Sequence, residues 1–332
     1  MTVTARLLKK GPQYMSFHIL GTGSYLPPLV VTNDDIAKFV DTNDEWISTR
    51  TGIKSRHVSV DETASEMGAK AALEALKSAG ISAEELDLIL CATVSGEYIV
   101  PSLACMIQKD IGAHCPAFDM SAACSAFTVL METAAAYIST GRYKKILLVG
   151  TEQMSRILDW TDRSTCILFG DGAGAIVVEP GDGYLGSHMT FTGGDEVLNV
   201  PTKIGISPFW KGEETHSYVN MNGGETYKFA TRSVPAEIQA LLDQCSVEQS
   251  EVDWVVCHQA NRRIIDAVAR RLKGISPEKF LCNIEDHGNT TAATIPLLLD
   301  EYNKKGLFKK GDLIVVAAFG GGLSCIASLI RW

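Results

Sequence analysis

The sequence predicts an α/β protein built from two similar halves, because apolar strands alternate with amphipathic helices and the same order of elements occurs twice. At 332 residues, with 46% hydrophobic and 21% charged residues, the chain is long enough for a large divided core. We expect an N-terminal extension at residues 1–15, a first half over residues 16–185 and a second half over residues 186–332.

The first matching elements are an amphipathic helix and the buried strand that follows it. In the first half the periodicity predicts a helix over Met67–Ala79 and a strand over residues 85–92. In the second half it predicts a helix over Val234–Cys245 and a strand over residues 251–258. An Asp and a Cys recur in the two strands at the same separation of 166 positions, which indicates an internal duplication.

A second helix and strand extend the match. A helical segment runs from Cys124 to near Gly141, and its counterpart runs from Thr290 to near Gly306. Each is followed by two lysines and an apolar strand, over residues 146–149 and 313–316.

Two glycine-containing turns complete the repeat. Phe-Gly sequences at Phe169 and Phe319 are both interpreted as opening an apolar strand. Two such halves favour pseudo-twofold packing with a functional site near their junction. Residues 192–222 lack periodicity and are rich in Gly, Pro and polar residues, so we interpret them as a long loop that forms a pocket wall.

Composition excludes several classes of protein. A net charge of −9 argues against a nucleic-acid-binding surface. No apolar run is long enough to cross a membrane, and residues 1–15 lack the apolar core of a secretory signal, so we expect a cytoplasmic protein. Nine cysteines without a C-x-x-C pair indicate reduced thiols and no metal site.

Cys124 is the first candidate for chemistry. It lies where an apolar strand gives way to small residues and then to a helix. The free backbone N–H groups and the positive end of a helix dipole favour a thiolate, the form that attacks carbonyl carbon. Burial as a structural cysteine is the competing interpretation.

Polar residues of the second half supply partners for Cys124. His258 follows a buried strand at its carboxyl end, where α/β proteins place ligands. Asn289 occupies nearly the place that Cys124 holds in the first half, so pseudosymmetry predicts that the two face each other. The Phe319-Gly-Gly-Gly turn offers backbone N–H groups that can form an oxyanion hole with the N–H of Cys124.

Together these motifs resemble the β-ketoacyl-acyl-carrier-protein synthase III family. The ordered set is Ala-Ala-Cys124-Ser-Ala-Phe, His258-Gln-Ala-Asn, His-Gly-Asn289-Thr and Phe319-Gly-Gly-Gly, and the resemblance runs from about Ile19 to Trp332. It implies a five-layered αβαβα thiolase fold with two pseudo-symmetric halves, a homodimer, and decarboxylative condensation of an acyl-CoA with malonyl-acyl-carrier protein.

The resemblance also implies the catalytic roles. Cys124 carries the acyl group, and the N–H groups of Cys124 and Gly321 hold the oxyanion. The Nε2 atom of His258 and the amide of Asn289 stabilise the enolate that forms when the malonyl group loses CO₂.

Substrate contacts follow from the same resemblance. Four residues are expected to bind CoA, which acts as a substrate handle and not as a resident cofactor: Trp46, Arg50, Arg163 and Asn261. Trp46 and Arg163 are expected to sandwich the adenine. Val100 and Phe319 are assigned to the acyl pocket. Just before Pro101 the family often has an aromatic residue that reaches into the partner subunit's acyl pocket, and this chain has Val100 there, so we expect tolerance of branched or longer acyl groups.

A basic helix after Asn261 is the expected carrier-protein surface. Its apolar stripe leaves cations on other faces, which suits electrostatic steering of an acidic partner. These cations are Arg262, Arg263, Arg270 and Arg271.

Rival interpretations remain at this point. A hydroxymethylglutaryl-CoA synthase needs a glutamate where this chain has Thr93-Val-Ser95, with Glu97 out of register. A thiolase proper uses a second catalytic cysteine, and Cys325 lies in a different pattern. Two further alternatives are a condensing enzyme of polyketide or alkylquinolone synthesis with the same three site residues, and a non-catalytic subunit that binds acyl thioesters.

Overall fold

Two mixed five-stranded sheets form the framework of the described residues in this computed structural model, which are residues 16–202, 209 and 215–332. The first sheet has the order β1 (Ser16–Tyr25), β7 (Asp171–Gly181), β6 (Ile146–Gln153), β4 (Leu88–Ala92), β5 (Ala117–Met120). The second has the order β8 (Tyr184–Phe191), β14 (Ser324–Arg331), β13 (Leu313–Gly320), β11 (Trp254–Cys257), β12 (Phe280–Leu281). Residues 1–15, expected to be an extension, lie outside the described part.

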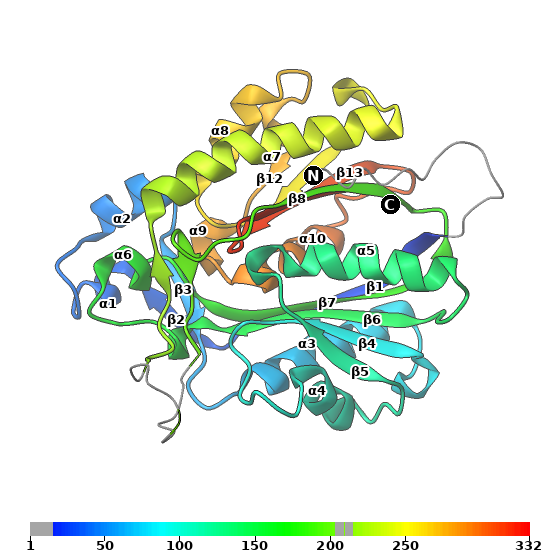
Figure 1. The fold of residues 1–332 in the computed structure, drawn as a ribbon, viewed down its shortest axis with the longest axis horizontal. Coiled ribbons are helices and arrows are strands. Elements are labelled where there is room, and N and C mark those ends of the chain that lie inside the picture. The colour runs from blue at the N-terminus through cyan, green and yellow to red at the C-terminus, as the bar shows by residue number, and fades with distance from the viewer. Residues whose placement is uncertain (1–15, 203–208, 210–214) are drawn as a thin grey trace.

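Helices separate and cover the two sheets, which gives the expected five layers (Figure 1). The outer face of the first sheet packs against α3 (Ala64–Ala79) and α4 (Leu103–Ile111). The outer face of the second sheet packs against α7 (Gly223–Cys245) and α8 (Arg262–Arg271). In the middle, α5 (Ala126–Ser139) and α10 (Thr294–Lys304) share one core with residues from both sheets.

Smaller elements connect these layers and border the site. The strands are β2 (Leu29–Thr32) paired with β3 (Ser55–Val58), and β9 (Leu198–Asn199) paired with β10 (Asn220–Met221). The short helices are α1 (Asn33–Ile36), α2 (Asp44–Thr51), α6 (Arg163–Cys166) and α9 (Ile284–His287). The 3₁₀ turns are η1 (Ala83–Glu85), η2 (Ala123–Ser125), η3 (Met154–Arg156), η4 (Gln249–Glu251), η5 (Pro277–Lys279) and η6 (Thr291–Ala293).

Local sequence explains where α3 begins and ends. The Thr63 side chain caps its first turn in a capping box with Glu66, and Gly80 ends it in the left-handed conformation with φ of 69°. Its buried face rests on β1, where a Cβ at Gly23 would come within 2.3 Å of the Ala71 carbonyl oxygen. The absence of a side chain at Gly23 therefore allows helix and sheet to pack closely.

The middle layer also depends on a glycine. A Cβ at Gly150 on β6 would lie 2.6 Å from the carbonyl oxygen of Ala292 in η6. This close approach of backbone to backbone joins the second half to the first sheet, directly beside the turn that carries Cys124.

The turns η2 and η6 define the structural register of the repeat. Both open on a residue with positive φ, Ala123 at 49° and Thr291 at 50°. Cys124 therefore corresponds to Ala292, and the sequence alignment of Cys124 with Thr290 was wrong by two positions. The turn geometry sets this register. The sequence alone does not, because small residues before and after each turn allow several alignments of the two halves.

The predicted match of Phe169 with Phe319 is also wrong. Phe169 precedes β7 and forms an isolated parallel bridge with Asn289, whereas Phe319 is the penultimate residue of β13. The strand β14 begins only at Ser324.

The helix α7 is longer than the predicted Val234–Cys245. It begins at Gly223, after Asn222 caps its first turn, and includes Pro235. Proline has no N–H to donate to the carbonyl four residues earlier, at Thr231. The guanidinium of Arg271 donates to the Thr231 carbonyl instead, so the helix continues through the proline.

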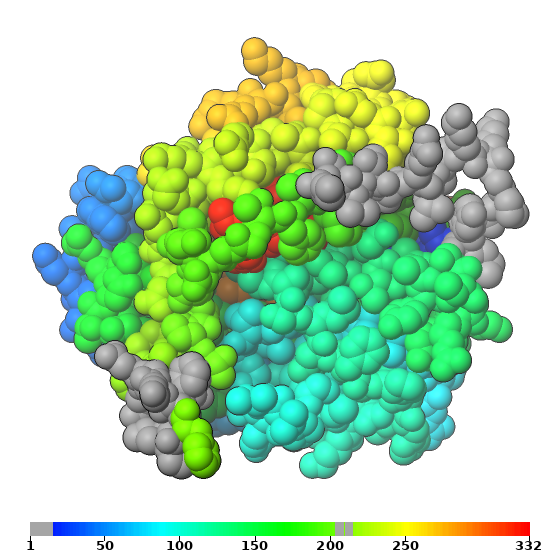
Figure 2. Space-filling model, in the orientation of Figure 1, coloured from blue at the N-terminus to red at the C-terminus, as the bar shows by residue number. Residues whose placement is uncertain are grey.

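The expected long loop borders the cavity, as predicted. Leu198, Val200 and Val219 line it, and β9 and β10 form a small ladder within the loop. Positions 203–208 and 210–214 of this segment lie outside the described residues. In the space-filling view, residues of α7 and α8 form one side of the molecule and residues of the first half the other (Figure 2).

Candidate active site

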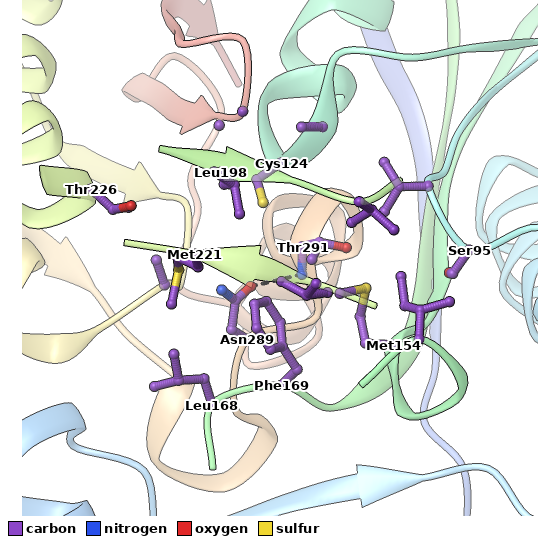
Figure 3. A pocket seen from close by; sticks show the side chains of 18 of the residues that line it. Ser95, Cys124, Met154, Leu168, Phe169, Leu198, Met221, Thr226, Asn289 and Thr291 are labelled. Atoms are coloured by element: carbon purple, nitrogen blue, oxygen red, sulfur yellow. Dashed lines mark hydrogen bonds between the residues drawn. The ribbon is translucent and has the colours of Figure 1, made fainter. Parts of the chain in front are cut away.

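A cavity of about 1190 Å³ opens where the carboxyl ends of β4, β5, β11 and β13 meet the β9–β10 segment. Residues from both halves line it, among them Cys124, His258 and Asn289. Figure 3 shows Cys124 and Asn289 on this cavity. The structure thus brings together the three residues that the sequence predicted for catalysis.

Cys124 lies in η2, directly before α5, and is 9% exposed. In Figure 3 its sulfur points into the space that Asn289 also borders. Burial raises the pKa of the Cys124 thiol to about 12, and the charge of Glu152 adds to the rise. The expectation of a ready thiolate was therefore wrong, because desolvation outweighs the stabilising backbone N–H at the start of the helix.

His258 follows β11 and is almost completely buried. Its Nδ1 atom lies 2.7 Å from the Thr294 hydroxyl, and its ring packs edge-to-face against Phe319 with centroids 5.3 Å apart. Burial lowers the pKa of the imidazole to about 3, so His258 is neutral at physiological pH.

Asn289 is held by both its backbone and its side chain. Its N–H donates to the Leu168 carbonyl at 2.9 Å, and its carbonyl accepts from the Gly170 N–H at 3.1 Å. Its Oδ1 accepts from the Thr291 N–H at 2.8 Å, so the amide N–H₂ group remains as the donor. The preceding Gly288, with φ of 65°, makes the sharp turn that this position requires.

The glycine turn after β13 packs on the nucleophile. A Cβ at Gly320 would lie 2.8 Å from the backbone nitrogen of Cys124, and Gly320 and Gly321 both line the cavity. The turn therefore brings the backbone assigned to the oxyanion hole against η2. Phe319, assigned to the acyl pocket, also lines the cavity.

Val100 lies apart from the other residue assigned to the acyl pocket. It is 79% exposed, in a segment whose neighbours Tyr98 and Ile99 are also exposed. Tyr98 and Ile99 line the cavity of their own chain, whereas Val100 is not among its lining residues.

Three of the four residues expected to bind CoA line the cavity, namely Trp46, Arg50 and Asn261, whereas Arg163 is not among the lining residues and packs on Trp46. The guanidinium carbons of Arg50 and Arg163 lie 4.7 and 4.8 Å from the ring centroid of Trp46. An adenine between Trp46 and Arg163 needs about 3.5 Å on each of its faces, so Arg163 must move outward to admit it. Asn261 caps α8 through its bond to the Arg263 N–H and also donates to the Arg50 carbonyl.

The four arginines predicted to bind a carrier protein differ in their surroundings. Arg263 lies over the Tyr227 ring at 5.6 Å, and both residues line the cavity. Arg262 forms an ion pair with Asp266, and Arg271 bonds to the Thr231 carbonyl. Arg270 is exposed near the end of α8.

Sequence reasoning missed Glu152, a completely buried carboxylate near Cys124. It accepts hydrogen bonds from Ser95 Oγ, Thr93 Oγ1 and the Val94 N–H, and so holds one wall of the cavity. Burial raises its pKa to about 6, although these bonds act in the opposite direction. A charged residue within the apolar strand that begins at Ile146 was the available signal.

In residues 16–202, 209 and 215–332, no cluster of three or more His, Cys, Asp or Glu side chains is arranged to hold a metal ion. Within the same residues, no helix has the length and apolar character needed to span a membrane.

The layered fold and a cysteine, histidine and asparagine around one cavity define a thiolase-fold condensing enzyme. The family models for 3-oxoacyl-[acyl-carrier-protein] synthase III match residues 118–193 and, for its C-terminal part, residues 242–332. A β-ketoacyl-[acyl-carrier-protein] synthase III of Clostridium acetobutylicum is 47% identical over 326 residues, which are 96% of this chain and 99% of that protein.

Solved structures give the same result. The 3-oxoacyl-[acyl-carrier-protein] synthase III of Aquifex aeolicus is 44% identical, with a TM-score of 0.89 over 96% of this chain and 100% of that one. The priming β-ketosynthase of a polyketide pathway is 33% identical, with a TM-score of 0.89 over 97% and 98% of the two chains. The chain belongs to the β-ketoacyl-[acyl-carrier-protein] synthase III family.

Proposed function

We propose that this protein condenses an acyl-CoA primer with malonyl-acyl-carrier protein and so begins type II fatty acid synthesis. The products are β-ketoacyl-acyl-carrier protein, CoA and CO₂. The observation that carries the proposal is the convergence of Cys124, His258 and Asn289 on one cavity, with the Asn289 amide fixed as a donor. No metal or resident cofactor takes part, and the reaction takes place in the cytoplasm.

In the first half-reaction Cys124 takes up the acyl group. Its thiol releases a proton to solvent and its sulfur attacks the thioester carbonyl of acyl-CoA, which forms a tetrahedral oxyanion. The N–H groups of Cys124 and Gly321 stabilise that charge. The carbon–sulfur bond to CoA then breaks, CoA leaves as its thiol after taking a proton, and the acyl group remains on Cys124.

In the second half-reaction the malonyl thioester supplies the carbon nucleophile. Loss of CO₂ leaves its electron pair on an enolate, whose oxygen accepts hydrogen bonds from His258 Nε2 and Asn289 Nδ2. The enolate carbon attacks the acyl carbonyl and displaces Cys124. The new carbon–carbon bond gives the β-ketoacyl product, and the displaced Cys124 thiolate takes a proton from solvent, which restores the thiol.

The role of His258 as a donor needs a particular tautomer. For Nε2 to carry the proton, Nδ1 must accept a hydrogen bond from the Thr294 hydroxyl, 2.7 Å away. The same hydroxyl donates to the Thr291 carbonyl at 2.9 Å, so this tautomer requires the hydroxyl proton to turn from that carbonyl to Nδ1. The neutral state of His258 suits a donor that loses no proton during the reaction.

A condensing enzyme of secondary metabolism is the second candidate. The 33% identity to a priming polyketide ketosynthase over nearly the whole chain favours it. It uses the same three residues and differs in the acyl donor and in the fate of the product.

Two other rival reactions do not match the residues of the site. Glu97 lines the cavity and accepts hydrogen bonds from the N–H and the hydroxyl of Ser65, but it is out of register with Thr93–Ser95, where a hydroxymethylglutaryl-CoA synthase requires a glutamate. Cys325 lies buried within β14, among residues packed against the outer helices α7 and α8, and does not line the cavity.

The enzyme tolerates branched or longer primers beyond acetyl in this proposal. Val100 replaces the larger aromatic residue that the family often has, which leaves more space in the partner subunit's acyl pocket. Acyl-CoA panels analysed by mass spectrometry test this, and loading of acetyl alone on Cys124 contradicts it.

A homodimer is part of the same proposal. The strand β5 lies at the edge of the first sheet, and the neighbouring segment exposes Tyr98, Ile99 and Val100. An edge strand beside exposed apolar side chains suits pairing with a second copy. Sedimentation equilibrium of the wild-type chain and of Ile99→Asp tests this, with a dimer expected only for the wild type.

The mouth of the cavity beside α8 is the proposed carrier-protein surface. Arg263 lines the cavity and Arg270 is exposed on the same helix, whereas Arg262 and Arg271 are already bonded within the chain. Charge reversal at Arg263 or Arg270 is expected to raise the KM for malonyl-acyl-carrier protein and leave acyl-CoA loading unchanged.

The function as a whole is tested with purified protein, a panel of acyl-CoAs and either malonyl-acyl-carrier protein or malonyl-CoA. We expect CO₂ release only when both an acyl donor and a malonyl thioester are present, and we expect Cys124→Ala to abolish β-ketoacyl product formation. Unchanged product formation in Cys124→Ala overturns the mechanism.

A further inference from the structure

Arg56 on β3 is a completely buried cation whose hydrogen-bond partners are neutral oxygen atoms. Its guanidinium donates to the Val31 carbonyl at 3.2 Å, to Asn33 Oδ1 at 2.9 Å and to the Ile167 carbonyl at 2.7 Å. Burial lowers its pKa to about 10, so it stays charged at neutral pH. Burying a cation without a carboxylate partner costs free energy, so its bonds call for a specific explanation.

One branch of these bonds leads to Arg163. The carbonyl that accepts from Arg56 belongs to Ile167, the residue directly after α6. Arg163 is the first residue of that four-residue helix, so the position of Ile167 fixes where the Arg163 backbone lies.

The other branch leads to Trp46. Asn33 is buried, and the bond from Arg56 to its Oδ1 leaves its Nδ2 as a donor. Nδ2 donates to Asp44 Oδ1 at 2.8 Å and to the Ile53 carbonyl at 2.7 Å. Asp44 is the first residue of α2 and Ile53 lies just beyond its end, so Asn33 holds both ends of the helix that carries Trp46.

We propose that Arg56 is a positioning residue for the nucleotide part of the acyl-CoA substrate. Through Ile167 and Asn33 it sets the separation between Arg163 and Trp46, the two side chains that close on the adenine. The inference rests on the proposed function, because it takes acyl-CoA as the acyl donor.

Asn33 and Arg56 differ in how far their removal reaches. The Ile167 segment continues to Leu168, whose carbonyl accepts the N–H of Asn289, so a change at Arg56 also reaches the asparagine of the second half-reaction. Acylation of Cys124 does not use Asn289, so a test confined to the acylation step isolates the effect on the nucleotide. Asn33 contacts the α2 side, so Asn33→Ala changes the position of Trp46 and leaves the bond at Ile167 in place.

The test compares two acyl donors that differ only in the nucleotide. Single-turnover acylation of Cys124 is measured with acetyl-CoA and with acetyl-pantetheine, for wild type, Asn33→Ala and Arg56→Lys. We expect both variants to raise the half-saturating concentration of acetyl-CoA about tenfold, as for loss of one hydrogen bond to a charged group. The half-saturating concentration and the acylation rate with acetyl-pantetheine are expected to change by less than about twofold.

Asn303→Ala is the matched control, because its amide bonds the Thr22 hydroxyl at 3.0 Å, outside both branches. It is expected to match the wild type with both donors. Equal losses with both donors in Asn33→Ala show a general structural effect and overturn the inference, as do unchanged kinetics. If Arg56→Lys does not fold, Asn33→Ala decides alone.

The same measurement separates the two levels of proposal. A wild-type chain that acylates Cys124 with neither donor overturns the proposed function. A wild-type chain that acylates with both, together with variants that do not distinguish the donors, overturns only the role of Arg56.

Discussion

The side-chain oxygen of Asn289 accepts a hydrogen bond from the backbone N–H of Thr291, at 2.8 Å. Thr291 opens the turn η6, in which the backbone has a positive φ, so the same turn that mirrors the Cys124 turn also orients the asparagine. The amide nitrogen is left as a donor beside the nucleophile, and several predictions depend on this arrangement.

Replacement of Asn289 by Asp keeps the shape and the bond to Thr291 but substitutes a carboxylate for the amide donor. Negative charge next to the forming enolate is expected to slow CO₂ release about 10²- to 10³-fold, while acylation of Cys124 continues. Stopped reactions analysed by intact mass should therefore show accumulated acyl-enzyme. Normal CO₂ release in Asn289→Asp contradicts the donor role.

Thr294→Val removes the hydroxyl that contacts His258 Nδ1, to which the proposed mechanism assigns control of the tautomer, and keeps the volume of the side chain. The decarboxylation step is expected to slow about tenfold, because the Nε2 proton is no longer held in place. Thr294→Ser should restore most of the rate. Equal rates in the Val and Ser variants argue against tautomer control.

The pH dependence of thiol alkylation tests the protonation state of Cys124. With a pKa of about 12, the thiolate fraction and the rate of iodoacetamide alkylation at Cys124 should rise about tenfold per pH unit between roughly pH 7 and 9. Peptide mapping distinguishes Cys124 from the other cysteines. A plateau near neutral pH contradicts the assignment of a resting thiol.

Glu152→Gln removes the charge that helps to raise the Cys124 pKa. Glu152 itself has a pKa of about 6, so it is charged at about pH 8 and its loss there should lower the thiol pKa and speed alkylation several-fold. At about pH 5, where the carboxyl is protonated, wild type and variant should react alike. The control Ser95→Ala removes a hydrogen bond and keeps the charge; equal acceleration in both variants would point to loosening of the cavity wall.

Gly150→Ala tests the close contact between the halves. The new Cβ would lie 2.6 Å from the Ala292 carbonyl, so the free energy of unfolding in urea is expected to fall by about 1–3 kcal/mol. Gly193→Ala, with no atom within 4 Å of the added Cβ, should change stability little. Equal stability of the two variants contradicts the packing described for β6 and η6.

Much of the fold followed from periodicity. The α3 helix, the strands β4 and β11, and the alternation of layers all have apolar positions spaced as their elements require. The segment before Val234 was missed because Pro235 reads as a helix boundary. Only the structure shows that Arg271 satisfies the carbonyl that the proline leaves free.

The three catalytic candidates were also found from the sequence. Cys124, His258 and Asn289 each follow a strand or a turn, and all three line the same cavity. The pKa of Cys124 could not be predicted from the sequence, because desolvation depends on how tightly distant segments such as the Gly320 turn pack against the thiol. Glu152 and Arg56 were missed for the same reason: their roles lie in bonds between segments far apart in the chain.

The central claim is that Cys124 carries the acyl group. The direct test is mass spectrometry of the protein after brief incubation with acyl-CoA alone, followed by peptide mapping and then addition of malonyl-acyl-carrier protein. We predict one acyl group on Cys124, no acylation in Cys124→Ala, and loss of the acyl group on malonyl addition with matching CO₂ release. An acyl group on another residue, or one that malonyl-acyl-carrier protein does not remove, would contradict the account.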